Sequence, residues 1–287
     1  MHDLPVLRRR PAPTPVPAPE STRLVYSLIG ELARRHDPAL PPIHPGPELA
    51  PFELRVFSQN GEDGVIAELV RRAGAPGRFF VEFGIGPGLE GNCVFLAQVL
   101  GWSGLFIEPA GDAYEELARR FAGHPAVRTE QARVTPDNVE GLFELGGVPA
   151  EPDVLSIDVD GNDYWIWEAL ERFRPRIVVI EYNGALDPSR RLVQPLDPDS
   201  SYDGTDFYGA SLGALRALGE SKGYRLAHTD LAGVNAFFVR SDLNVSLPDR
   251  VAARDINLFL AGVRHQPHSG DKAFLDLDAG FTGAPRA

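Results

Sequence analysis

The chain has 287 residues, of which 43% are hydrophobic, and its formal net charge is −12. This composition excludes global disorder and favours one elaborated domain, while the acidic balance argues against sequence-independent nucleic-acid binding, which needs clustered Lys and Arg. The single cysteine, Cys93, excludes an internal disulfide, and no apolar run reaches the roughly 18 residues of a membrane helix, so we expect a cytoplasmic protein without a membrane contact.

The first 50 residues are predicted to form a Pro-rich arm with one short helix. Prolines at every second position from 11 to 19 favour an extended polyproline conformation. A helix is expected to begin at Ser21 and to end before Pro38, and a second Pro-rich linker spans 38–51. The arm is a candidate lid or a candidate contact in a homo-oligomer.

The body of the chain alternates between short apolar runs and helical patterns. Continuous apolar strands that alternate with helices indicate a parallel sheet covered on both faces. The strands are predicted at 79–83, 104–108, 126–129, 154–159 and 177–182, with helices at 60–73, 92–100, 114–121 and 164–173.

The pattern changes after residue 210. A helix is predicted over 211–221, and strands at 224–228 and 235–240 are joined by a short turn, which predicts an antiparallel hairpin. The expected fold is therefore α/β and Rossmann-like, with a mostly parallel seven-stranded sheet that ends in an antiparallel hairpin, as in class I methyltransferases. This domain is expected over 51–244, followed by an extension over 245–287 with a short helix near 250–262.

A glycine cluster follows the first predicted strand. Glycines at alternate positions let the backbone turn sharply and approach a ligand closely. Glu82 stands just before the first glycine, which suits a ligand with an ammonium group, such as the methionine half of S-adenosylmethionine (SAM). The predicted cofactor contacts here are Glu82, Gly84, Gly86, Gly88 and Asn92, the last at the start of the next helix.

An acidic residue also ends the second predicted strand. Glu108 lies 20 positions after Gly88, which is the place where dinucleotide-type folds bind the ribose diol of a nucleoside. We therefore expect Glu108 to bind the ribose of the cofactor.

Three carboxylates follow the fourth predicted strand. Alternation places Asp158 and Asp160 on one side while the chain stays extended, and clustered carboxylates need a proton, a cation or hydrogen-bond donors. A helix N-cap explains one of them, such as Asp163. Asp158 and Asp160 are the candidate catalytic bases, and Asp158 is also a candidate cofactor contact.

Polar residues end the fifth predicted strand as well. Glu181 and Asn183 are expected to converge with Asp158, and these three residues offer the oxygen ligands that Mg²⁺ or Ca²⁺ prefers. A metal-free site with Asp158 or Asp160 as the base is equally compatible with the sequence.

The long loop over 187–209 lies beside this edge of the sheet and is a candidate lid or acceptor pocket. A solvated surface loop is the alternative interpretation for each of its residues. The candidate acceptor contacts are Tyr202, Asp203, Asp206 and Tyr208.

Taken together, these motifs resemble the FkbM-type family of SAM-dependent methyltransferases over roughly 55–242. Members of that family carry Glu where this chain has Asp160, and Gly-Ala-Glu where it has Gly-Asn-Asp at 161–163, which indicates a variant subgroup. The phrases that carry the resemblance lie at 57–64, 80–84, 156–163, 179–183 and 209–212.

The resemblance implies SAM binding and methyl transfer, often to an oxygen of a sugar or natural-product scaffold. It also implies that Gln59, Asn60 and Asp63 line the cofactor pocket, whereas the residues alone indicate a helix cap at Asn60 and a favourable first-turn charge at Asp63.

The function expected from the sequence is O-methylation of a small molecule that carries hydroxyl groups. N-methylation, carboxyl-methylation and a SAM-binding module without catalysis are the alternatives. A nicotinamide-dependent oxidoreductase is disfavoured by the closing hairpin and by Glu82.

Overall fold

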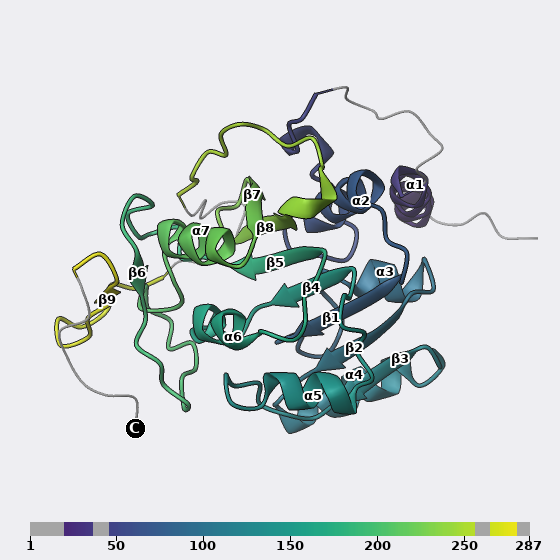
Figure 1. Cartoon of the computed structure of the whole chain (residues 1–287). Coiled ribbons are helices and arrows are strands. Elements are labelled where there is room, and N and C mark those ends of the chain that lie inside the picture. The colour runs from purple at the N-terminus through teal and green to yellow at the C-terminus, as the bar shows by residue number, and fades with distance from the viewer. Residues whose placement is uncertain (1–19, 37–45, 256–264, 280–287) are drawn as a thin grey trace, which may run out of the picture.

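The computed structural model describes residues 20–36, 46–255 and 265–279, and its centre is a seven-stranded sheet (Figure 1). The first five strands pair in parallel, and β8 lies antiparallel to both of its neighbours, β5 and β7. The expected fold class is therefore confirmed. The strand order is β3 (Val127–Glu130), β2 (Ser103–Ile107), β1 (Phe79–Phe83), β4 (Val154–Ile157), β5 (Ile177–Glu181), β8 (Asn235–Arg240) and β7 (Tyr224–Thr229).

Helices cover both faces of the sheet because alternate strand residues point to opposite sides. Phe80 packs in the core under one set of helices, and Val81 packs in the core under the other set. The first set is α2 (Glu62–Ala73), α3 (Val94–Gln98) and α4 (Gly111–Phe121), and the second is α5 (Val139–Leu145), α6 (Asp163–Ala169) and α7 (Leu212–Ser221).

The expected N-terminal helix exists and joins the body of the protein. It is α1 (Glu20–Arg35), which packs against α2 (Figure 1). Leu32 is fully buried beside Ala67 and Phe95, and Phe52 at the end of a 3-10 turn (Ala50–Phe52) is buried against α2. Burial of each such side chain contributes about 1.5–3 kcal/mol, so part of the predicted arm adds to the core.

The chain after β8 returns to the loop that follows β5. Two short strands, β6 (Leu192–Val193) and β9 (Leu275–Asp276), pair antiparallel at the edge of the molecule beyond α7 (Figure 1). Residues 250–255 of the predicted short helix are not helical, and the rest of that prediction, 256–264, lies outside the described residues. No helix in the described part of the chain is long and apolar enough to cross a membrane.

Candidate functional site

Three cavities adjoin at the carboxyl ends of β1, β2, β4 and β5. Their volumes are about 350, 340 and 260 Å³, and we call them the first, second and third cavity. Gly84 and Asp158 line all three, so the cavities meet where the loops after β1 and β4 cross.

Gly84 makes this crossing tight. Its φ is +78°, and an added Cβ would overlap the carbonyl oxygen of Asp158. Only glycine fits a left-handed backbone at such a close approach. Gly84 is thus required because the backbone after β4 passes so close to it. This close approach places the glycine loop next to the catalytic candidate Asp158.

Glu82 lies at the end of β1 and holds the start of α3. One carboxylate oxygen accepts the N–H of Asn92 at 2.7 Å, and the other accepts the N–H of Cys93 at 2.9 Å. Burial raises the pKa of Glu82 to about 7. The first cavity is lined by the predicted residues Gln59, Glu82, Gly84, Gly86 and Asn92, and also by Glu62 and Asn235.

Glu62 is a buried acid that the sequence did not single out. Its Oε2 accepts the N–H of Asn60 at 2.8 Å, and its Oε1 accepts a hydrogen bond from Asn235 Nδ2 at 2.9 Å. The acidic first turn of α2 could have indicated Glu62, but the sequence-based prediction included only its neighbour Asp63. Glu62 ties the loop before α2 to β8 across the cavity.

Asp63 is not among the residues that line the three cavities. Its Oδ2 accepts the backbone N–H groups of Val56, Phe57 and Ser58 at 2.7–2.8 Å, and burial raises its pKa to about 6. The structure therefore places Asp63 behind the site, where it holds the loop that carries Gln59.

Glu108 at the end of β2 lines the second cavity. One carboxylate oxygen accepts the N–H of Gly86 at 2.7 Å, and the other accepts the N–H of Ala110 at 2.9 Å. Gly86 has φ +60° and open space where a Cβ would stand, so it leaves room for a ligand. Gly88 lies outside the three cavities and packs closely on α4 beside Leu117.

The third cavity contains a cluster of three carboxylates. Oxygen atoms of Asp158, Asp160 and Glu181 all lie within 4.8 Å of one another. Burial, together with neighbouring carboxylates, raises the pKa of each group. Asp160 has φ +56°, an unfavourable conformation for a residue other than glycine, and it faces the cavity from this turn.

Asp163 and Asn183 do not belong to this cluster. Asp163 accepts the N–H groups of Val159 and Gly161 at 2.9 Å, as a cap of the turn before α6. The side-chain oxygen of Asn183 accepts the N–H of Ala185, and its amide nitrogen donates to two carbonyl oxygens of the 206–208 segment. The prediction of Asn183 as a metal ligand is corrected here, because its amide holds the loop over 187–209, which we call the acceptor loop, and Asp160 supplies the third carboxylate of the cluster.

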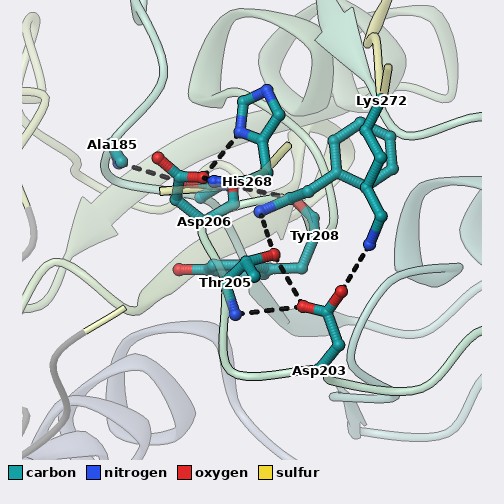
Figure 2. A network of polar contacts seen from close by, with 9 residues as sticks. Ala185, Asp203, Thr205, Asp206, Tyr208, His268 and Lys272 are labelled. Atoms are coloured by element: carbon teal, nitrogen blue, oxygen red, sulfur yellow. Dashed lines mark hydrogen bonds and ion pairs between the residues drawn. The ribbon is translucent and has the colours of Figure 1, made fainter. Parts of the chain in front are cut away.

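The candidate acceptor contacts divide into two pairs. Tyr202 and Tyr208 line the third cavity. Figure 2 shows that Asp203 and Asp206 instead face the C-terminal segment, where Asp203 pairs with Lys272 and Asp206 with His268 Nδ1 at 2.6 Å. These two aspartates thus fasten residues 265–278 over the acceptor loop.

His265 is a cavity residue that the sequence did not predict. Its Nδ1 lies 2.8 Å from the hydroxyl oxygen of Tyr202, and its ring stacks on Tyr208 with centroids 5.0 Å apart. Burial lowers its pKa. His265 belongs to the C-terminal extension, in which the sequence predicted a short helix near 250–262 and no site residue.

No family model matches the chain, and no curated protein matches it. Among similar solved structures, the N-terminal domain of EvdMO1 with SAH bound has 16% identity and a TM-score of 0.41 over 76% of this chain and 94% of that chain. M. jannaschii TYW2 in complex with AdoMet has 17% identity and a TM-score of 0.35, over 61% and 75% of the two chains. A SAM-dependent methyltransferase from Aquifex aeolicus has 13% identity and a TM-score of 0.38, over 74% and 96%. These values describe a likeness of fold alone.

Proposed function

We propose that the chain is a SAM-dependent methyltransferase that acts on a small molecule. The observation that carries the proposal is the meeting of three cavities at Gly84 and Asp158, with Glu82 and Glu108 beside the first and second cavities. An open α/β sheet binds its ligands at this edge. The resemblance of the sequence motifs to the FkbM-type family, whose members transfer methyl groups from SAM, also supports the proposal.

The two larger cavities would hold the two halves of SAM. The methionine half fits the first cavity, where the carboxylates of Glu62 and Glu82 suit its ammonium group. The adenosine half fits the second, where Glu108 would accept hydrogen bonds from the ribose hydroxyls. Each oxygen of Glu108 accepts one backbone N–H, and a carboxylate oxygen offers two acceptor sites, so capacity for the ribose remains.

The bound cofactor would supply an electrophilic methyl group on a sulfonium. Asp158 lies at the junction of the cavities and would accept the proton of an acceptor hydroxyl. Methyl transfer would form the new C–O bond as the C–S bond breaks, with the electron pair left on sulfur and S-adenosylhomocysteine (SAH) as the product. Burial and the neighbouring carboxylates raise the pKa of Asp158, which strengthens it as a base, and the fixed cavities supply attack geometry.

The finer parts of the proposal concern the acceptor and the metal. Transfer to a hydroxyl of a sugar or natural-product scaffold is the form that we favour, and N- or carboxyl-methylation is the alternative. A divalent cation such as Mg²⁺ is the alternative to a metal-free site: Asp158, Asp160 and Glu181 would hold it, and it would bind acceptor oxygens and lower the pKa of a hydroxyl. The domain is proposed to span 51–244, with a homo-oligomer contact through the N-terminal arm.

Calorimetry with SAH, with and without Mg²⁺, tests the cofactor and the metal together. We expect SAH to bind with a Kd on the order of micromolar and NADH not to bind. NADH binding without SAH binding would show a nicotinamide enzyme instead. Asp158→Ala is expected to abolish turnover and to leave SAH binding intact, and unchanged turnover would remove Asp158 from the mechanism. Intact SAH binding without turnover on every acceptor tried would indicate a binding module.

A further inference from the structure

We propose that the methyl acceptor carries an ammonium group, which binds among the carboxylates of Asp158, Asp160 and Glu181 in the third cavity. The inference rests on the proposed function, since it assigns this cavity to the acceptor. It names a substrate class, a hydroxylated amine, in place of an uncharged alcohol or sugar.

The charge of the third cavity favours a cation as its occupant. Three carboxylates line it, and none of its described lining residues is Lys or Arg. His265 is the one basic side chain among those residues, and burial lowers its pKa. Like charges this close repel strongly in a partly buried site, so an occupant with a positive charge gains more there than a neutral one.

Glu181 supplies an observation that is independent of the charge count. Its Oε2 is buried at the end of β5 and has no hydrogen-bond partner. A buried polar atom without a partner destabilises the fold, and a ligand with N–H donors would remove this cost. Among the three cavities, Glu181 lines the third one only. Its unpaired oxygen therefore indicates a ligand in the third cavity, which we assign to the methyl acceptor, and not in the cofactor cavities.

An ammonium group fits the spacing of the cluster. Its three N–H donors bond to carboxylate oxygens at about 2.7–2.9 Å, which for tetrahedral nitrogen places the oxygens about 4.6 Å apart. The three oxygens lie within 4.8 Å of one another. The cluster can therefore bind one ammonium nitrogen without rearrangement of the strands.

The aromatic walls favour an organic cation over a metal ion. Tyr202, Tyr208 and His265 line the same cavity, and the ring of Tyr202 lies at 90° to that of Tyr208 with centroids 6.2 Å apart. Aromatic rings attract ammonium groups and pack on their alkyl chains, whereas Mg²⁺ prefers oxygen ligands and water. The amide oxygen of Asn183, which would have been a neutral metal ligand, is bonded to Ala185 instead.

The ammonium is the anchor and not the nucleophile, because a protonated nitrogen has no free electron pair. The methylated atom is then a hydroxyl of the same molecule. Asp158 lines the cofactor cavities as well as the third cavity, so it is placed to receive the hydroxyl proton. One oxygen of Asp158 then serves the hydroxyl, while its other oxygen, Asp160 and Glu181 hold the ammonium.

A pair of probes that differ only in charge tests the proposal. The full chain, saturated with SAH and free of metal in EDTA, is titrated with 3-aminopropan-1-ol and with butan-1-ol, in which a methyl group replaces the ammonium. Binding is followed by NMR of ¹³C-labelled histidine, with the His265 signal assigned by its loss in His265→Gln. We expect the amine to bind at least tenfold more tightly than the alcohol.

Two variants and one control locate the effect. Glu181→Gln and Asp160→Asn are each expected to remove most of the amine preference, and the exposed Asp160 provides a variant whose folding is not in question. Asp137→Asn changes the net charge equally at an exposed position outside the three cavities and should leave the preference intact.

Equal binding of the amine and the alcohol would overturn the proposal. So would tight MgCl₂ binding at the cluster, measured without EDTA, together with no amine preference, since the cluster would then be a metal site. The proposed function is judged separately by SAH calorimetry. If SAH binds and the amine preference is absent, only the acceptor inference fails, whereas absence of SAH binding contradicts the methyltransferase itself.

Discussion

The crossing of the loops after β1 and β4 can be tested by two glycine substitutions that differ in one respect. Gly84→Ala and Gly86→Ala both place a Cβ on a residue with positive φ, at +78° and +60°. The left-handed conformation costs about 1–2 kcal/mol for alanine in either position. At Gly86 the added atom meets open space, whereas at Gly84 it overlaps the carbonyl oxygen of Asp158.

We therefore expect Gly86→Ala to lose about 1–2 kcal/mol of unfolding free energy and Gly84→Ala to lose about 1–3 kcal/mol more, the usual cost of overpacking. Gly84→Ala should also weaken SAH binding by more than tenfold, because the loop must move away from Asp158. Urea unfolding measures the first effect and calorimetry the second. Equal losses in the two variants would show that the two loops do not approach each other as the structure places them.

Three further predictions concern other parts of the site. Glu108→Ala should weaken SAH binding by about 10–100-fold in calorimetry, since the ribose contact and the anchor of Gly86 are both lost, whereas Glu130→Ala at the exposed end of β3 should leave the affinity unchanged. Burial raises the pKa values of Glu82 and Asp230 to about 7, above their ordinary values of 4.5 and 3.8, so the folded chain binds more protons than the unfolded chain between about pH 4 and 7. The unfolding free energy of the ligand-free protein should accordingly fall as pH rises through this window, and urea titrations at pH 5 to 8 that show a rise would contradict the assignment. Asp206→Asn should speed hydrogen exchange over 265–278 without a change in SAH affinity, and unaltered exchange would mean that the bond to His268 does not fasten this segment.

The central strands could be predicted because their sequence is apolar without interruption. The residues of β5 from Ile177 to Ile180 are all fully buried, so both faces of this strand demand apolar side chains. Helix α5 was not predicted, since it has seven residues and carries Gly141 in its interior. The pairing of β6 with β9 joins two-residue strands more than 80 positions apart, for which no local pattern exists.

The site was harder to predict because strand alternation fails where a strand ends. Glu181 is the last residue of β5, and Asn183 no longer continues its alternation. The N–H of Asn183 bonds instead to the carbonyl oxygen of Ala210, which turns the side chain into the acceptor loop. Asp158 and Asp160 do meet in one cluster, but through the turn at Asp160 and not through an extended chain.

The carboxylates of the site divide by what they contact, and this division favours a positively charged ligand. Glu82, Glu108 and the buried acids nearby accept backbone N–H groups and thereby shape the loops. Asp158, Asp160 and Glu181 accept no hydrogen bond from the described residues, although burial raises the pKa of all three. Acids that lie this close together and neither cap a turn nor pair with a base weaken the fold, so their presence together is explained by a ligand that they bind. The structure thus separates the acids that build the site from those available to act in it.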